Sequence, residues 1–337
     1  MNLQERKDLL VQLGNFMASD DEAWQTAKRK AAAANGWFIP EFIDLSIYNI
    51  VEQFLGENEL QKLIDDYGLE ENPAPKKVGI VMAGNIPLVG FHDLLCTFIT
   101  GHYAVVKPSS KDEVLITALV EKMKELNENS EPYLAISERL IGCNAYIATG
   151  SNNSSHYFEY YFAKYPHIIR KNRTSVAILS GDETDEELEA LADDVYQYFG
   201  LGCRNVTKIY IPRNFNFERL LNIFKKYNYL ADYSKYKNNY DYNLAVHLLN
   251  KKYFMSNESL LLVEDPTPFS PIAQLHYEYY DDLDKLKASL DNSENIQCLV
   301  GKTLLPFGKA QTPGICSFAD GVDTIEFLQS LTEVRKS

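Results

Sequence analysis

One cysteine of the sequence lies in a loop that suits a nucleophile. Cys203 follows the glycine-rich segment 200–202 and precedes Arg204, between an acidic helical pattern and the apolar run 206–212. A cysteine attacks a carbonyl carbon as its thiolate, and a neighbouring cation favours the thiolate. Glycines allow positive φ and a close approach of the backbone. Because a lone cysteine is most often buried and inert, Cys203 by itself fits either a nucleophile or a small core residue.

The other cysteines have less favourable settings. Cys96 and Cys143 lie in or beside apolar runs and Cys298 lies in a strand pattern, so we expect these three in the core. Cys316 lies in a loop and is the rival nucleophile. The cysteines are odd in number and scattered, without the spacing of a metal site. We therefore expect no metal, and a reduced, cytoplasmic compartment.

A second candidate is the side-chain amide of Asn85, in the loop 84–87 that follows the apolar run 78–82. An N–H₂ group can stabilise the oxyanion that develops when a nucleophile attacks a carbonyl. Asparagine in a loop also stabilises turns without any further role. For Asn85 taken alone, both interpretations stay open.

Two more loops carry groups that suit a dinucleotide. One follows the apolar run 104–107, and the other follows the run 145–149 and begins a helical pattern. A lysine there can reach a ribose or a phosphate, and amides at a helix N-terminus bind anions. The structural alternatives are a solvated lysine and a plain helix cap. The usual Gly-x-Gly-x-x-Gly turn follows none of the expected strands. The expected cofactor ligands are Lys107, Ser109, Ser110, Gly150 and Ser151.

An alternation of short apolar runs and helical patterns places these loops. Residues 1–70 are predicted to be helical, and from residue 78 short strands alternate with helices. This alternation predicts an α/β fold with a doubly wound parallel sheet, in which ligands bind outside the carboxyl ends of the strands. The expected strands are residues 78–82, 104–107, 145–149, 175–179, 206–212, 259–264, 271–277 and 296–301.

The length and charge of the chain bound its class. With 337 residues, of which 45% are hydrophobic, the chain can form two domains. We expect a helical N-terminus and dinucleotide-binding domain in residues 1–199, a smaller α/β catalytic domain in 200–305, and a segment 306–337 that packs back on the cofactor domain. A net charge of −14 argues against non-specific binding of nucleic acid. The sequence has no apolar run of about 20 residues, so we expect no transmembrane helix.

In this order, the motifs resemble those of the aldehyde dehydrogenase superfamily. The segment 85–87 resembles its Asn-Phe-Pro loop, and 105–109 resembles the strand that leads to its ribose-binding lysine. Residues 150–151 resemble its Gly-Ser at the pyrophosphate, Cys203 its nucleophile, and 268–286 the region around its Phe-Gly-Pro motif, with Ser270 in place of the glycine. The resemblance implies an aldehyde-dehydrogenase-like fold with the family's site roles. Asn85 and Cys203 would be catalytic, while Lys107 and the Gly150-Ser151 pair would bind the cofactor.

One departure from the superfamily pattern bears on the reaction. Hydrolytic aldehyde dehydrogenases carry a Glu-Leu-Gly-Gly stretch whose carboxylate activates water, whereas residues 168–179 contain no carboxylate. The amino-acid sequence, including residues 306–314 and 318–324, is most similar to that of the acyl-CoA reductase family related to the fatty-acid reductase of bacterial luminescence. This resemblance implies an acyl-CoA substrate and a thioester on Cys203.

Other activities remain as alternatives. They are a hydrolytic NAD(P)-dependent aldehyde dehydrogenase, a reductase of phosphate-activated acyl groups, and a non-catalytic dinucleotide-binding protein with this fold. The chain is shorter than many relatives of this family, and the elements through which those relatives oligomerise can be missing from it. The resemblance still allows a homo-oligomer.

A second departure bears on the cofactor. Many NAD-preferring relatives carry a glutamate directly after Lys-Pro-Ser, where this chain has Ser110 and then Lys111. Loss of a carboxylate and gain of a cation suit a 2′-phosphate, so the resemblance favours NADPH, with NADH as the alternative. Residues 227–242 are rich in tyrosine, and we expect a surface insertion or hairpin there. The alternative is a wall of the acyl tunnel or a surface that docks coenzyme A.

Overall fold

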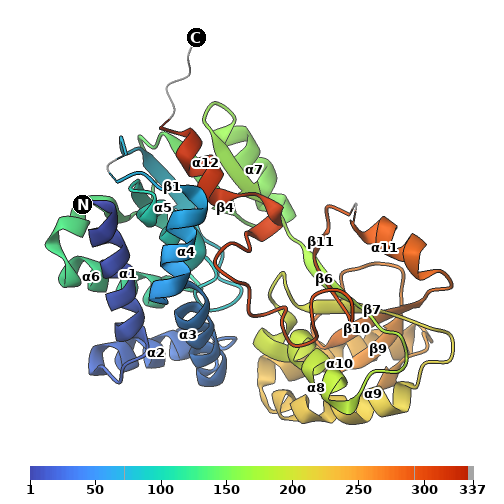
Figure 1. Cartoon of the computed structure of the whole chain (residues 1–337). Coiled ribbons are helices and arrows are strands. Elements are labelled where there is room, and N and C mark those ends of the chain that lie inside the picture. Colours follow the sequence, from blue (N-terminus) through green and yellow to red (C-terminus); the bar gives the residue numbers. More distant parts are fainter. Residues whose placement is uncertain (72, 292, 333–337) are drawn as a thin grey trace. The chain divides into compact units, whose positions relative to one another are not determined.

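The computed structural model describes residues 1–71, 73–291 and 293–332. The chain forms two compact units, and each is described by itself (Figure 1). The first unit contains residues 1–172 and the segment from Pro313 onwards. The second unit contains Arg173–Thr312 and is therefore inserted into the first along the chain.

The first unit begins with four helices, as the sequence predicts. They are α1 (Leu3–Met17), α2 (Glu22–Ala34), α3 (Pro40–Phe54) and α4 (Glu57–Tyr67). Local sequence signals set their ends. Asn2 and Glu5 form a capping box at the start of α1, and Pro40 occupies the first turn of α3. Gly68, with φ of 54°, ends α4 in the left-handed conformation.

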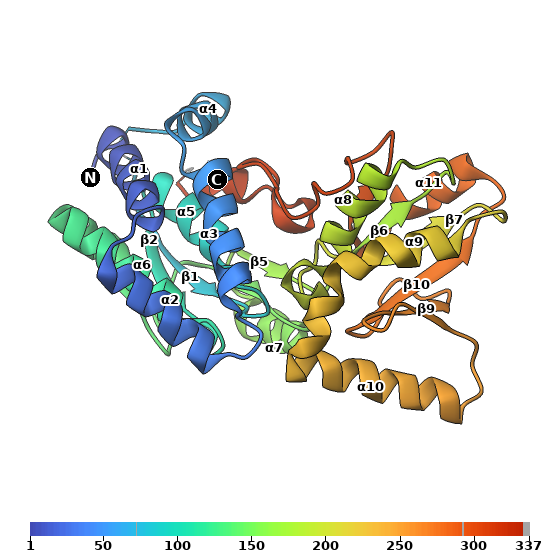
Figure 2. The ribbon, with the colours of Figure 1, turned by 90° about the horizontal axis from the view of Figure 1, so that it is seen from below.

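A five-stranded parallel sheet lies at the centre of the first unit, with the order β3-β2-β1-β4-β5. Its interior strands are short and apolar because helices cover them. The helices α1 and α2 pack on α6 (Figure 2), and α12 packs on α5. The strands are β1 (Lys77–Val81), β2 (Tyr103–Lys107), β3 (Leu134–Ile136), β4 (Ala145–Thr149) and β5 (His167–Arg170). The remaining helices are α5 (Phe91–Ile99), α6 (Glu113–Leu126), α7 (Asn152–Phe162) and α12 (Thr324–Ser330), with the 3₁₀ turns η1 (Glu128–Tyr133) and η4 (Ala319–Gly321).

The second unit contains a six-stranded sheet with the order β11-β6-β7-β10-β9-β8, in which only β8 is antiparallel to its neighbour among the described strands. In Figure 1, α8, α9 and α10 lie together below this sheet and α11 lies above it. The strands are β6 (Thr174–Ile178), β7 (Val206–Ile211), β8 (Met255–Ser256), β9 (Leu261–Glu264), β10 (Gln274–Tyr279) and β11 (Ile296–Val300). The helices are α8 (Asp185–Tyr196), η2 (Gln197–Gly200), α9 (Phe217–Ile223), η3 (Phe224–Asp232), α10 (Ser234–Leu249) and α11 (Leu283–Asp291).

The α/β fold class expected from the sequence is confirmed, but the units divide at other residues than expected. The stretch 168–179 forms two strands, one in each sheet, rather than a single one. Because β6 pairs with β7 and β11, the second unit begins at Arg173 and not at residue 200. The segment that packs on the first unit begins at Pro313 and not at residue 306, since Asp194 of α8 holds residues 308–310 in the second unit.

The tyrosine-rich segment is helical, so the expected hairpin is wrong. Residues 227–242 lie in η3 and in the first half of α10. Tyr227, Tyr236 and Tyr240 are buried, whereas Tyr242 is exposed. Tyr236 and Tyr240 are four residues apart and therefore lie on one face of α10. Packing of this face against the rest of the unit favours the helix.

Candidate active site and cofactor loops

The candidate oxyanion residue Asn85 lies in the loop after β1. In this loop a Cβ on Gly84 would come within 2.7 Å of Ser109 Oγ, so only glycine fits against the loop after β2. Ser46 Oγ donates to the carbonyl of Pro87 at 2.7 Å. Asn85 itself is half-buried. The sequence therefore builds a tightly packed loop that exposes part of one amide side chain.

The candidate cofactor residues follow β2 and β4, at the same edge of the sheet. The register pairs Val81 with both Lys107 and Ala148, so β1, β2 and β4 end side by side. Lys107 and Ser110 are exposed, and Ser109 is half-buried. The strand order reverses between β1 and β4, and open α/β sheets bind ligands at such a reversal.

The loop after β4 fits the phosphate groups of a dinucleotide. Ser151 caps α7 by accepting a hydrogen bond from the amide of Ser154 at 3.3 Å. A Cβ on Gly150 would lie 2.9 Å from the ring of Phe158, so glycine lets the backbone lie against the start of α7. Exposed amides at a helix N-terminus attract anions. The residues at this edge of the sheet thus fit a dinucleotide. Lys107, the last residue of β2, provides a cation at the same edge.

The candidate nucleophile Cys203 belongs to the second unit, in the turn between η2 and β7. It is half-buried, and its carbonyl accepts a hydrogen bond from Ser175 Oγ at 3.2 Å. The residues before it have an unusual backbone, because Tyr198, Phe199 and Gly200 all have positive φ, between 55° and 73°. For Tyr198 and Phe199 this conformation is unfavourable, and the surrounding packing must maintain it. The loop is therefore shaped by packing as well as by glycine.

A buried asparagine holds the Cys203 loop on α8. Asn205 Oδ1 accepts from the amide of Gly202 at 2.7 Å. Its Nδ2 donates to the carbonyls of Asp194 at 3.0 Å and Gln197 at 2.9 Å. Asn205 is completely buried. Asn205 was not expected as a site residue from the sequence, although an asparagine two residues after a candidate nucleophile in a glycine turn was a usable signal.

The remaining cysteines agree only partly with expectation. Cys96 and Cys143 are buried, as predicted, but Cys298 is half-buried and its Sγ accepts a hydrogen bond from Arg204 Nη1 at 3.2 Å. From the sequence, Arg204 was the cation expected to favour the thiolate of Cys203. One nitrogen of its guanidinium instead donates to Cys298. Cys316 is exposed, and desolvation followed by the charge of Asp66 raises the pKa of its thiol. A raised pKa keeps Cys316 protonated at neutral pH and weakens it as a nucleophile.

The place where hydrolytic relatives carry their carboxylate base is filled differently. Arg170 ends β5 and is buried, and its Nη2 lies 2.6 Å from Asp93 Oδ1. It also donates to the carbonyl of Ala319 at 2.7 Å and to Thr324 Oγ1 at 2.9 Å. The charge of Asp93 raises the pKa of Arg170 although burial opposes this, so the guanidinium remains a cation. Arg170 joins β5, α5 and the C-terminal segment, and it cannot act as a base.

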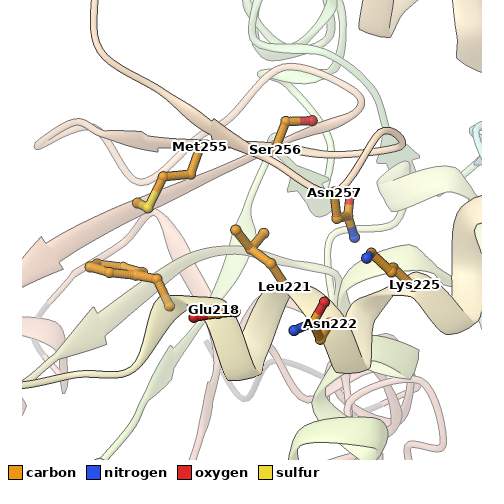
Figure 3. A pocket seen from close by; sticks show the side chains of 8 residues that line it. Glu218, Leu221, Asn222, Lys225, Met255, Ser256 and Asn257 are labelled. Atoms are coloured by element: carbon orange, nitrogen blue, oxygen red, sulfur yellow. The ribbon is translucent and has the colours of Figure 1, made fainter.

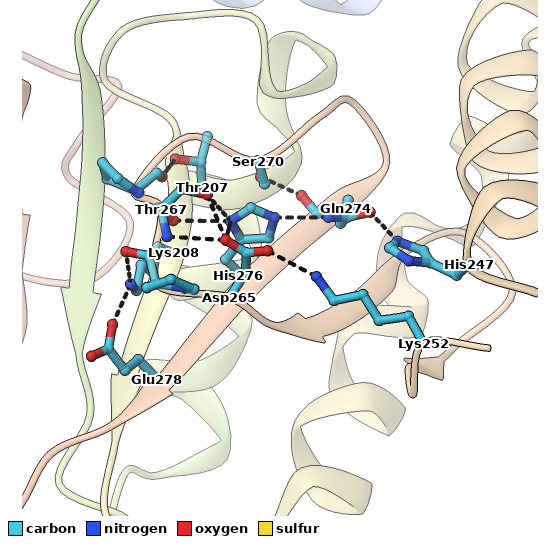
Figure 4. Close-up of polar contacts among 12 residues, drawn as sticks. Thr207, Lys208, His247, Lys252, Asp265, Thr267, Ser270, Gln274, His276 and Glu278 are labelled. Carbon is cyan, nitrogen blue, oxygen red and sulfur yellow. Dashed lines mark hydrogen bonds and ion pairs between the residues drawn. The ribbon is translucent and has the colours of Figure 1, made fainter. Parts of the chain in front are cut away.

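Sequence reasoning missed a buried polar network around residues 265–271, the region that resembles Phe-Gly-Pro (Figure 4). Lys208 is completely buried on β7, and its Nζ donates to the carbonyl of Pro266 at 2.7 Å and to Glu278 Oε2 at 2.5 Å. His276 Nδ1 lies 2.9 Å from the carbonyl of Thr267. Burial lowers the pKa of His276, so its ring is neutral. A lone lysine inside an apolar strand was the available signal.

This network fixes the loop through its backbone. Gln274 links the rings of His276 and His247, each at 2.7 Å. Thr207 Oγ1 donates to the carbonyl of Pro268 at 2.6 Å, and Ser270 Oγ donates to that of Gln274 at 2.6 Å. Buried polar groups that are satisfied in this way restrict the loop to one conformation.

One hollow of the second unit lies at the other end of β7 from Cys203. It measures about 410 Å³ and is formed between α9 and β8, where Phe217 and Met255 provide apolar surface and Lys225 a cation (Figure 3). Cys203 precedes β7, whereas Phe217 follows it, so this hollow is not the nucleophile's pocket. Within residues 1–71, 73–291 and 293–332, no group of histidine, cysteine or acidic side chains could hold a metal ion. None of the described helices is long and apolar enough to cross a membrane.

Comparisons with known proteins identify a family and a fold. Residues 44–216 match the sequence model of the family described as "Acyl-CoA reductase (LuxC)". A search of the curated proteins finds no match to the chain. Among solved structures, aldehyde dehydrogenase 21 from Physcomitrella patens in complex with succinate has a TM-score of 0.70 at 12% identity, over 98% of this chain and 85% of that one.

Two further structures contain a dinucleotide. An aldehyde dehydrogenase from Mycobacterium tuberculosis complexed with NAD⁺ has a TM-score of 0.67 at 14% identity, over 89% of this chain and 73% of that one. A succinic semialdehyde dehydrogenase from Streptococcus pyogenes in complex with NADP⁺ has a TM-score of 0.63 at 12% identity, over 88% of this chain and 76% of that one. At such identities the likeness shows the aldehyde-dehydrogenase-like fold.

Proposed function

The chain belongs to the LuxC acyl-CoA reductase family, and from this premise we propose that it reduces an acyl-CoA thioester to the aldehyde with NADPH. The family and the fold make it an oxidoreductase of aldehyde chemistry. The observation that carries the finer proposal is the Cys203 loop. Three left-handed residues and the buried Asn205 hold a half-buried thiol at the start of β7.

In the proposed reaction, the Cys203 sulfur attacks the thioester carbonyl and forms a bond to its carbon. The oxygen gains negative charge, and the Asn85 side-chain amide and the Cys203 backbone amide donate hydrogen bonds to it. The carbon–sulfur bond to coenzyme A then breaks, and the coenzyme leaves as a thiolate that takes up a proton. The acyl group remains on Cys203 as a thioester, which divides one difficult reduction into two steps.

The first unit is the proposed dinucleotide domain and the second the proposed catalytic domain. Lys107, Ser109 and Ser110 would contact the ribose that carries the 2′-phosphate, and Gly150 with Ser151 the pyrophosphate. The bound dinucleotide would supply the hydride that releases the aldehyde from Cys203. Lys111, an exposed cation at the end of the same loop, supports NADPH over NADH.

The absence of a base supports acyl-CoA over hydrolysis. A hydrolytic enzyme needs a carboxylate that activates water near the acyl-enzyme. The corresponding stretch 168–179 has no carboxylate, and its Arg170 is committed to Asp93, Ala319 and Thr324. Transfer of the acyl group between thiols requires no such base, which favours the proposed donor.

Mass spectrometry of the intact protein after mixing with an acyl-CoA tests the proposal. We expect one added acyl group on the wild type and none on Cys203→Ala, whereas Cys316→Ala should still be acylated. NADPH should then remove the acyl group and release aldehyde. Acylation of Cys203→Ala, or strong turnover of aldehyde with NADP⁺ in the absence of coenzyme A, would refute it.

A further inference from the structure

A buried carboxyl group lies between the oxyanion loop and the cofactor loop. Asp112 immediately precedes α6, where a short acidic side chain ordinarily caps its own helix. In the described part of the chain, however, its side chain caps no amide of α6. Its Oδ2 instead accepts a hydrogen bond from the amide of Leu88 at 2.6 Å, and Asp112 is only 3% exposed.

The amide that Asp112 binds belongs to a backbone that needs support. Leu88 has φ of 57°, a left-handed conformation that is unfavourable for a residue with a branched side chain. It follows Asn85 by three residues, after Pro87. Ser46 holds the carbonyl of Pro87. The hydrogen bonds from Ser46 and to Asp112 thus hold the carbonyl and the amide of a single peptide group, the one that joins Pro87 to Leu88.

Asp112 is also part of the cofactor loop. Its amide donates to the carbonyl of Ser109 at 2.9 Å, and Ser109 Oγ accepts from the amide of Lys111 at 3.3 Å. Gly84 packs against Ser109 so closely that no Cβ would fit. The turn of residues 109–112 therefore contacts the oxyanion loop at both Gly84 and Leu88.

We propose that Asp112 is a positioning residue that couples the cofactor loop to Asn85 through the amide of Leu88. The inference rests on the proposed function, in which Asn85 stabilises the oxyanion. Because its partner amide is only three residues from Asn85, movement of Asp112 changes where the Asn85 amide points. Ordering of residues 109–112 by the dinucleotide would then also order the oxyanion loop.

The carboxyl group acts in its neutral form. Among the described residues, nothing hydrogen-bonds to its Oδ1, which is buried. Burial raises the pKa of Asp112 to about 8, against the weaker opposite effect of the Leu88 amide. A protonated carboxyl accepts the amide through its carbonyl oxygen, and an asparagine side chain can do the same with almost the same shape. Asparagine is therefore the matched replacement, and alanine removes the acceptor.

The test compares Asp112→Asn with Asp112→Ala in the full chain. We expect Asp112→Ala to lower kcat for NADPH oxidation with an acyl-CoA by about 10- to 100-fold, because the oxyanion donor is displaced. KM for the acyl-CoA should change by less than about threefold. Asp112→Asn should keep kcat within about threefold of the wild type. Hydrogen exchange at the Leu88 amide should accelerate in Asp112→Ala and not in Asp112→Asn.

Asp21→Ala is the control, because Asp21 caps its own helix α2 through the amides of Ala23 and Trp24. Its kcat should be unchanged. Wild-type kcat and Leu88 exchange in Asp112→Ala, or an equal loss of kcat in both Asp112 variants, would overturn the proposal. If the alanine variant does not fold, Asp112→Glu, which displaces the acceptor by one methylene, must lower kcat relative to Asp112→Asn.

The same experiment separates this inference from the proposed function. A wild-type protein that reduces no acyl-CoA would refute the proposed function alone. In that case, hydrogen exchange at the Leu88 amide and the affinity for NADPH still test whether Asp112 couples the cofactor loop to the oxyanion loop. Asp112→Ala should loosen the loop of residues 109–112. Binding of NADPH must then order this loop, and the entropy lost in doing so should weaken the affinity. Unchanged Leu88 exchange together with unchanged NADPH affinity would overturn the coupling.

Discussion

Replacement of Asn205 by alanine tests how the nucleophile loop is held. The asparagine side chain satisfies the buried amide of Gly202 and donates to the carbonyls of Asp194 and Gln197. The alanine side chain can do neither, and the site is completely buried. The variant therefore leaves buried polar groups of the loop without their partner.

The expected cost follows from these contacts. A buried group that loses its hydrogen bond costs about 1–3 kcal/mol. The Gly202 amide loses its acceptor, and the two carbonyls at the end of α8 and in η2 lose a donor. Because these losses share one side chain, they do not add fully. We expect a decrease of about 3 kcal/mol in the free energy of local opening, which corresponds to about a hundredfold faster exchange at the Gly202 amide.

Two measurements check this prediction. Hydrogen exchange reports the opening at Gly202, and the rate of acylation of Cys203 by an acyl-CoA reports the position of the sulfur. We expect the acylation rate of Asn205→Ala to fall by about a hundredfold as well. Asn216→Ala is a suitable control, because Asn216 makes a similar bond, to the amide of Arg219, at the exposed start of α9. Gly202 exchange and an acylation rate that match the wild type would refute the reasoning.

Three further predictions concern the first unit. Asn85→Ala should lower kcat by about 10²- to 10³-fold while Cys203 stays alkylable by iodoacetamide, and a smaller loss would remove Asn85 from the oxyanion site. Gly150→Ala should weaken NADPH binding by about tenfold in a fluorescence titration, because its Cβ would lie 2.9 Å from Phe158 and displace the start of α7; unchanged affinity would separate this loop from the cofactor. Since burial raises the pKa of Asp112 from 3.8 to about 8, the folded state retains a proton that the unfolded state loses, so the free energy of unfolding should fall as pH rises from about 4 to about 8. Urea denaturation at pH 5 and pH 9 should show this loss, about 4 kcal/mol, in the wild type and not in Asp112→Asn, and equal pH dependence would contradict the assignment.

The loops of the first sheet were predictable because their signals are local. Asn85, Lys107 and Gly150 each follow a short apolar run, and the parallel pairing brings the ends of those runs to one edge. The α/β class follows from the same alternation. Such signals need only a few consecutive residues, and the sequence displays them directly.

Features that depend on distant partners were not predictable. The polar stretch after Arg170 contains the boundary between the units, but only the pairing of β6 with β7 and β11 reveals it. Tyr236 and Tyr240 suit a strand as well as a helix, and packing decides between them. Asp112 directly precedes α6, as a helix cap does, and nothing in the sequence shows that its side chain accepts from Leu88, a residue of another loop.

The insertion of one unit into the other has a consequence for biosynthesis. During translation, residues 173–312 are made before the last described segment of the first unit, residues 313–332. Until residues 313–332 follow, Arg170 lacks its partners Ala319 and Thr324, and His102 lacks the carbonyl of Leu328. Arg170 can therefore complete its hydrogen bonds only after the chain beyond residue 312 has been made. The first unit thus needs chain from both sides of the second unit to complete its structure.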